Sequence, residues 1–122
     1  MQGRILLSDN SITLSESIRF ALSRNGYEVD TAWNEEQTIS MIKTGKYRLV
    51  IVDLKDMDTF GASVINFITG REVDSSVPAI LALSQPAEQE EISGIVSGGI
   101  KEWLMIPFSN EKLLNSVKKI LG

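Results

Sequence analysis

The sequence contains no cysteine and no histidine among its 122 residues. The absence of cysteine excludes a disulfide framework and a thiolate nucleophile. The absence of histidine excludes a Ser-His-Asp triad and a phosphohistidine, and without either residue a Cys/His zinc site is excluded as well. Any chemistry must therefore use carboxylates, amines, hydroxyls, backbone groups or a hard metal ion. The lack of cysteine also fits a cytoplasmic location.

Long hydrophobic runs are missing too, and no signal peptide is visible, so we expect no membrane association. The formal net charge of -4 and the sequence pI of about 4.8 argue against direct binding of nucleic acid. A length of 122 residues with 43% hydrophobic and 23% charged residues is typical of one globular domain. We expect residues 1–122 to form that single domain.

Five short apolar runs alternate with five segments of helical periodicity. Strands are predicted over residues 4–8, 27–32, 48–53, 78–83 and 102–106. Helices are predicted between them, over about 12–22, 34–44, 61–70 and 86–97, and after the last strand over 109–121. This alternation predicts an α/β fold: a doubly wound, five-stranded parallel sheet of order 2-1-3-4-5, the flavodoxin-like (βα)5 arrangement.

Two of these predicted strands run directly into a carboxylate. The unbroken apolar run 48–53 ends in Asp53, and the first strand is followed by Asp9. In the order 2-1-3-4-5 these two strands are neighbours, so both carboxylates converge at the edge where open α/β sheets bind ligands. Paired carboxylates repel unless a cation lies between them, and Mg²⁺ prefers such oxygen ligands. The alternative is a pair of solvated acids in loops.

At this point the chain resembles, over its whole length, the receiver domains of two-component response regulators. The resemblance rests on five features. The first strand is followed by the position of the family's acidic pair, the third strand ends in an acid, and the next loop ends in glycine. The fourth strand starts at proline, and the fifth contains an aromatic residue a few positions before a Pro-Phe dipeptide. These features are Asp9-Asn10, Asp53, Gly61, Pro78 and Trp103-Leu-Met-Ile106-Pro107-Phe108.

The resemblance implies that Asp53 is the phosphoacceptor and attacks a phosphohistidine on a histidine kinase or phosphotransfer protein. It implies Mg²⁺ held by Asp9, Asn10, Asp53 and the backbone carbonyl of Lys55. Trp103 takes the position of the switch aromatic. The peptide bond between Ile106 and Pro107 is expected to be cis, because only a bond before proline adopts that form at low cost.

Four departures from the family pattern stand beside these matches. Ile106 replaces the usual lysine, and Asn10 replaces the second acid. Counting from Pro78 puts the switch hydroxyl position at Leu83, so Ser84 serves only if the strand is one residue longer or bulged; otherwise it is a loop hydroxyl that caps the next helix. The loop after Asp53 also lacks the usual proline and has Phe60 where an acid is common.

Three functions are therefore open at this stage. The first is a receiver domain that accepts a phosphoryl group on Asp53 and is no enzyme beyond its own phosphorylation and dephosphorylation. The alternative is a pseudo-receiver, an interaction module that works without phosphorylation. A flavodoxin-like FMN site is disfavoured, because the loop Ser8-Asp-Asn-Ser11 begins with an acid that would repel phosphate. An effector domain, or a homodimer through the last two helices and strand 102–106, is a further expectation from the family.

Overall fold

The computed structural model describes residues 4–9, 11–53, 67–68, 70, 78–84 and 100–121. Five parallel strands form one sheet in the order β2-β1-β3-β4-β5, as predicted. This is the flavodoxin-like arrangement, and all five carboxyl ends of its strands lie at the same edge. The strands are β1 (Arg4–Ser8), β2 (Glu28–Ala32), β3 (Tyr47–Asp53), β4 (Ala79–Ser84) and β5 (Ile100–Met105).

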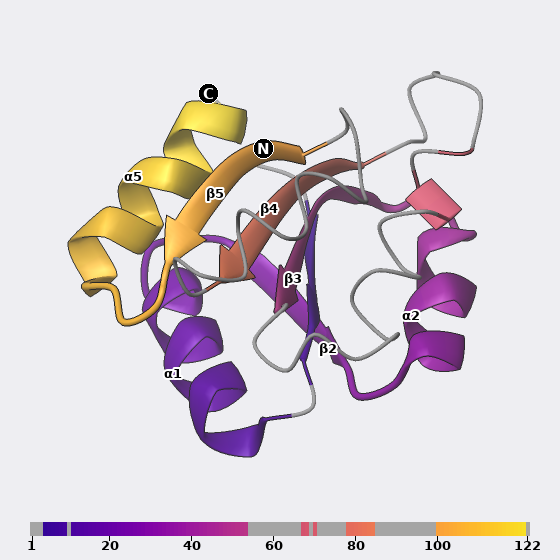
Figure 1. Ribbon diagram of the computed structural model, residues 1–122, viewed down its shortest axis with the longest axis horizontal. Helices are drawn as coiled ribbons and strands as arrows, with labels where there is room; N and C mark the ends of the chain where they lie inside the picture. The colour runs from indigo at the N-terminus through magenta and orange to yellow at the C-terminus, as the bar shows by residue number, and fades with distance from the viewer. Residues whose placement is uncertain are drawn as a thin grey trace.

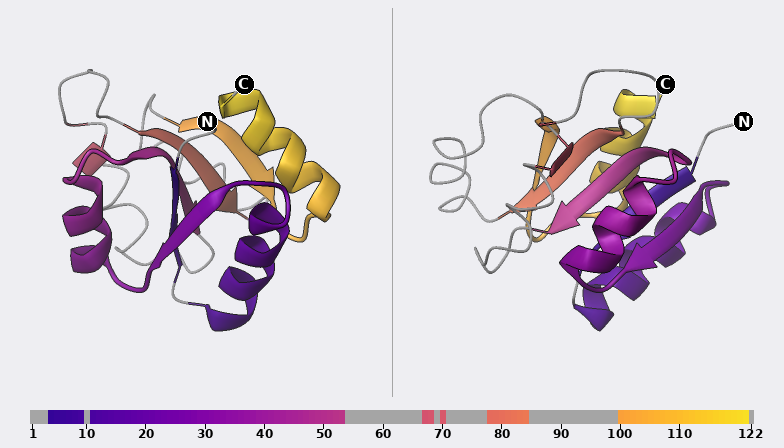
Figure 2. Two further views of the ribbon diagram at one scale, coloured as in Figure 1. Left: turned by 180° about the vertical axis from the view of Figure 1, so that it is seen from behind. Right: turned by 90° about the vertical axis from the view of Figure 1, so that its right-hand side faces the viewer.

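Helices cover both faces of the sheet (Figure 1). Helices α1 (Ile12–Ser23) and α5 (Asn110–Leu121) pack together on one face, and α2 (Glu35–Ile42) lies on the other, as both views of Figure 2 show. The helices predicted over 61–70 and 86–97 fall outside the described residues, apart from Phe67 and Ile68, which are helical, and Gly70, which lies in a turn. The described helices therefore agree with a doubly wound sheet.

Alternate residues of the central strands enter two separate hydrophobic clusters. Leu49 and Ile51 of β3 join the cluster under α1 and α5. Val50 and Val52 join the cluster under α2. Burial on both faces explains why this strand is an unbroken apolar run, and each buried side chain of this size stabilises the fold by about 1.5–3 kcal/mol.

The β2–α2 connection is held by hydrogen bonds at the start of α2. Asn34 is the N-cap, and its Oδ1 accepts the Gln37 N–H at 2.7 Å. The Gln37 side chain does not return to Asn34, as it would in a standard capping box; its Oε1 accepts the Trp33 N–H at 2.8 Å. The bond therefore fastens the backbone of Trp33, the first residue after β2.

The structure shifts two predicted strand boundaries at the far side of the sheet. β4 begins at Ala79 and includes Ser84, so the strand reaches one residue further than residues 78–83. β5 begins at Ile100, two residues earlier than predicted, and its pairing with β4 has a register shift between Ile80 and Leu81. The predicted cis peptide bond between Ile106 and Pro107 is present.

Candidate phosphorylation site

Asp9 and Asp53 lie side by side at the carboxyl edge of the sheet. Ser8 of β1 pairs with Val52 of β3 in parallel register, so the next residue of each strand is an aspartate. Neighbouring strands are about 4.7–4.9 Å apart, which places the two backbones within reach of one small ligand. Asp9 is only 1% exposed, whereas Asp53 is half-buried and so remains accessible from solvent. The predicted convergence of these two residues is confirmed.

Hydrogen bonds to neighbouring backbone fix the position of Asp9. Its N–H donates to the Ala32 carbonyl at 3.1 Å, which continues the ladder between β1 and β2. Its Oδ1 accepts the Ser11 N–H at 2.8 Å, and Ser11 is in turn the N-cap of α1. This turn holds the carboxylate at the start of α1, where the helix dipole favours negative charge.

Ser84 ends β4 one row beyond Asp53, because Asp53 itself pairs with Leu83. The Ser84 side chain is fully buried, and its Oγ has no hydrogen-bond partner within the described part of the chain. A buried hydroxyl without a partner costs about 1–3 kcal/mol, so such a group calls for an explanation. A ligand with acceptor oxygens at the carboxyl edge would supply the missing partner.

Trp103 lies on the same face of the sheet as Ser84. Trp103 pairs with Ala82, and Ser84 is two residues further along β4, so alternation brings both side chains to one face. Trp103 is half-buried and packs against the cluster under α2. The hydroxyl and the ring are therefore on the same side of β4 and β5.

Ile106 follows β5 and is tied to β4, since its N–H donates to the Ser84 carbonyl at 2.9 Å. Its side chain is half-buried and packs against the cluster under α1 and α5. This position thus contributes an apolar contact where the family pattern has an ammonium group.

The remaining predicted ligands, Asn10 and Lys55, lie outside the described residues, as does Gly61. Within residues 4–9, 11–53, 67–68, 70, 78–84 and 100–121, no group of three or more acidic side chains is close enough to hold a metal ion. Asp9 and Asp53 together still offer the hard oxygen donors that Mg²⁺ takes, and this ion often binds proteins through one or two carboxylates. These two residues fit a Mg²⁺ site.

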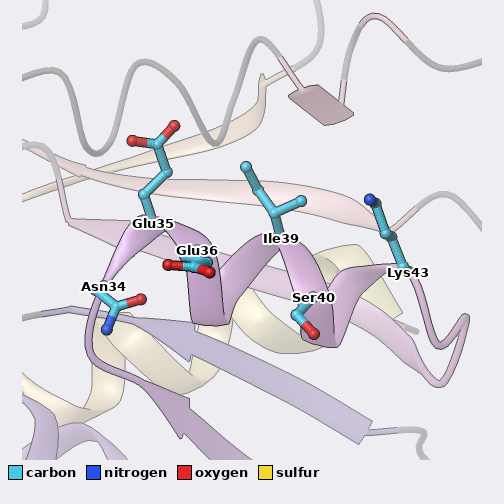
Figure 3. A pocket seen from close by; sticks show the side chains of 6 residues that line it. All are labelled: Asn34, Glu35, Glu36, Ile39, Ser40 and Lys43. Carbon is cyan, nitrogen blue, oxygen red and sulfur yellow. The ribbon is translucent and has the colours of Figure 1, made fainter.

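A hollow of about 520 Å³ runs along α2 (Figure 3), and neither Asp9 nor Asp53 is among its lining residues. Figure 3 shows Glu35, Ile39 and Lys43 projecting from one side of the helix. The Lys43 ammonium lies 5.9 Å from the centre of the Phe67 ring, a cation–π contact. All of its described lining residues belong to α2 or to the residues that flank this helix, so the hollow is separate from the carboxyl ends of β1 and β3.

Two features at the carboxyl edge were not predicted from the sequence. Trp33 directly follows β2 and remains 41% exposed. Ser8 and Thr38 are fully buried and their hydroxyl oxygens are 3.0 Å apart. The exposure of Trp33 could have been predicted, because this residue directly follows a predicted edge strand. Nothing local in the sequence pairs the two hydroxyls, which are 30 residues apart.

The order of the strands, the paired aspartates and the cis bond at Ile106-Pro107 agree with the resemblance seen in the sequence. The family model of the response regulator receiver domain matches residues 5–118. The chain belongs to this family.

Several curated regulatory proteins are similar to the chain. It is 27% identical over 121 residues to the response regulator MprA of Mycobacterium tuberculosis, and this alignment covers 99% of the chain and 51% of MprA. It is 26% identical over 115 residues to the transcriptional regulatory protein DltR of Streptococcus agalactiae, covering 94% and 50%. The chain thus spans about half the length of the curated relatives it matches.

A solved structure supports the same fold. The chemotaxis response regulator CheY4 of Vibrio cholerae superposes with a TM-score of 0.81 at 23% identity, covering 99% of the receiver and all of that chain. This receiver is a module of two-component signal transduction. Receiver domains generally bind Mg²⁺ at the phosphorylation site and are not classical enzymes, and response regulators interact with histidine kinases. No helix among the described residues is long and apolar enough to cross a bilayer.

Proposed function

We propose that this receiver accepts a phosphoryl group on Asp53 from a phosphohistidine of a partner protein. The observation that carries the proposal is the pairing of an accessible Asp53 with a buried Asp9 in the same row of the carboxyl edge. Two adjacent carboxylates, one at the surface and one fixed beneath it, suit an acceptor and a cation ligand. Solvated loop acids would not be arranged in this way.

The transfer itself is a displacement at phosphorus. A carboxylate oxygen of Asp53 attacks the phosphorus atom, the bond between phosphorus and the donor imidazole nitrogen breaks, and the imidazole takes up a proton as it leaves. The residue's place at the end of β3 holds the nucleophile still, because the strand behind it is buried on both faces. Proximity and orientation account for most of the protein's contribution to such a reaction.

Asp9 and Asp53 would hold Mg²⁺, with Asn10 and the Lys55 carbonyl as further ligands by analogy with the family. The ion supplies positive charge to the phosphoryl oxygens in the transition state. The Asp9 carboxylate would be held in place for this ion, because its Oδ1 accepts the Ser11 N–H and its backbone N–H donates to the Ala32 carbonyl.

Ser84 and Trp103 are proposed as the groups that respond to phosphorylation. The Ser84 hydroxyl has no partner among the described residues and can donate to a phosphoryl oxygen on Asp53. Its movement would free volume on the face that it shares with Trp103. The half-buried ring is then the group whose burial changes, which makes its fluorescence a useful reporter.

The wider context is part of the same proposal. Residues 1–122 form one receiver domain that acts in the cytoplasm, and it is proposed to pass its signal to an effector domain or to a second copy. The dimer surface would include α5 and β5. The helix expected over 86–97, which would complete that surface, lies outside the described residues.

Intact mass measured after incubation with Mg²⁺ and phosphoramidate tests the acceptor. We expect one added phosphoryl group on the wild-type chain and none on Asp53→Asn, which keeps the size of the side chain and removes its charge. Glu36→Gln serves as a matched control, because it removes an exposed acid of α2 that is not in the row of Asp53. An unmodified wild-type chain would instead favour an interaction module that works without phosphorylation.

A further inference from the structure

Trp33 continues the row of residues that contains both aspartates. Ala32 pairs with Ser8, and Ser8 pairs with Val52, so the next residues across three strands are Trp33, Asp9 and Asp53. The Asp9 N–H bond to the Ala32 carbonyl confirms that the ladder extends to this row. Trp33 is one of the four large hydrophobic side chains that are exposed among the described residues, and it is 41% exposed.

Hydrogen bonds fix the backbone of Trp33 and of the start of α2. The Trp33 N–H donates to Gln37 Oε1 at 2.8 Å, and the Gln37 N–H donates to Asn34 Oδ1 at 2.7 Å. Thr38 Oγ1 donates to the Asn34 carbonyl at 2.7 Å, so the Ser8 hydroxyl must donate its own proton to Thr38. This buried chain of hydroxyls ties the start of α2 to β1.

A ring on a fixed backbone loses little conformational freedom when a partner covers it. Exposed aromatic side chains cost free energy in water and bring large contact area to an interface, and tryptophan is enriched among the residues that dominate binding. The location of Trp33 therefore points to a contact that the isolated domain does not make.

The usual size of a protein interface indicates which partner would contact Trp33. Trp33 is two strands from Asp53, or about 10 Å across the edge. A standard interface covers about 800 Å² on each protein, equivalent to a disc with a radius of roughly 16 Å. A folded protein whose contact is centred on Asp53 therefore also covers Trp33, whereas a small phosphodonor need not touch it.

A second copy of the chain does not fit this edge. A symmetric dimer centred on this edge would bring Asp53, Glu35 and Glu36 of each copy close to the same acids of the other copy. Like charges brought together in this way repel. The donor protein is the occupant that the short distance from Trp33 to Asp53 favours.

We infer that Trp33 is a docking residue for the protein phosphodonor and contributes to the choice of that donor. Its indole packs against apolar surface beside the donor's phosphohistidine, and Ile12, 69% exposed at the start of α1, adds to the same contact. Trp33 takes no part in the displacement at phosphorus. The inference rests on the proposed phosphorylation of Asp53.

The test compares two classes of donor on the same variants. Phosphoramidate is the small donor, and the protein donors are the complete set of purified, autophosphorylated histidine kinases and phosphotransfer proteins of the source organism. For the fastest protein donor we expect Trp33→Ala to lower kcat/KM at least tenfold, mainly through KM, and Trp33→Phe to recover part of the loss. With phosphoramidate, Trp33→Ala should stay within twofold of the wild type.

Phe20→Ala is the matched control, because Phe20 is another exposed aromatic residue, 63% exposed, but lies two turns along α1 from the carboxyl edge. It should leave both rates unchanged. The docking role is overturned if Trp33→Ala reacts with the protein donor as fast as the wild type does, or if its reactions with both classes of donor slow equally. It is also overturned if no protein donor phosphorylates the wild type while phosphoramidate does, or if the substitution converts a dimer into monomers. Failure of both donors on the wild type would instead refute Asp53 as acceptor.

Discussion

Asp9 and Asp53 stand next to each other on parallel strands, one row beyond the pair formed by Ser8 and Val52. Adjacent carboxylates repel one another, and a cation bound between them relieves that repulsion. Stability and metal binding should therefore be coupled through the same two residues, and substitutions can separate the two effects.

Replacing Asp9 by asparagine should weaken Mg²⁺ binding at least tenfold while leaving the metal-free protein as stable as the wild type, or more stable by up to about 1 kcal/mol. Asparagine retains an Oδ1 acceptor for the Ser11 N–H, so the turn before α1 is preserved. Tryptophan fluorescence reports Mg²⁺ binding, and urea unfolding without metal reports stability. The exposed acid Glu16 supplies the control Glu16→Gln. Undiminished Mg²⁺ affinity in Asp9→Asn would contradict the assignment of Asp9 as a ligand.

Replacing two fully buried serines by alanine should change the stability of the protein differently. Ser8→Ala breaks the bond to Thr38 and should lower the free energy of unfolding by about 1 kcal/mol. Ser84→Ala removes a hydroxyl with no partner among the described residues, so stability should be unchanged or rise slightly. Urea unfolding of both variants measures the difference; equal losses would argue against an unpaired Ser84.

The same Ser84→Ala variant should also lose the response of Trp103 to phosphorylation. The chain has two tryptophans, so the experiment is made in a Trp33→Phe background in which Trp103 is the only indole. We expect phosphoramidate and Mg²⁺ to change the emission of the parent and to leave that of Ser84→Ala constant, although mass spectrometry detects phosphorylation of both. A preserved emission change would remove Ser84 from the switch.

Ile106→Lys introduces the ammonium group that the family pattern has at this position. A cation near Asp9 and Asp53 competes with Mg²⁺, so the dissociation constant for Mg²⁺ should rise several-fold. Ile106→Met keeps an apolar side chain of similar volume against the cluster under α1 and α5, and it should bind Mg²⁺ as the wild type does. Identical affinities in the two variants would show that position 106 does not face the site.

Tyr47 should stabilise the protein in neutral but not in strongly alkaline solution. Burial, and then the hydrogen bond that its hydroxyl donates to Asp30 Oδ2 at 2.7 Å, raise the pKa of Tyr47 to about 12. The ordinary pKa of tyrosine is about 10, so the folded state holds the proton more tightly than the unfolded state. The contribution is therefore complete below about pH 10 and is lost as the pH rises toward 12.

Tyr47→Phe removes this hydroxyl and gives the measurement. The wild type should be more stable than the variant by about 1–3 kcal/mol near neutral pH, because the bond is made to a charged acceptor. The difference should shrink steadily above about pH 10. Urea unfolding of the two proteins at a series of pH values follows it. A gap that stays constant to the most alkaline pH would refute the raised pKa.

Much of the fold could be predicted because the signals are local. Apolar runs, helical periodicity and the glycines that end α1 and α2 are properties of neighbouring residues, and they located the five strands and the helices α1, α2 and α5 to within a few residues. The absence of histidine and cysteine confined the chemistry to oxygen and nitrogen ligands. The boundary of β4 was misjudged by one residue, because the register against β3, which pairs Asp53 with Leu83, decides where that strand ends.

What the sequence by itself determined is therefore the five strands with their order in the sheet, the three described helices, and the two aspartates that follow neighbouring strands. Only the tertiary structure decided which side chains share a row or a face. The alignment of Trp33 with Asp9, the hydroxyl pair of Ser8 and Thr38, and the Ser84 hydroxyl that has no partner among the described residues all depend on tertiary packing. Register is fixed by the way the buried faces of segments far apart in the chain pack together, so it becomes visible only in the folded structure.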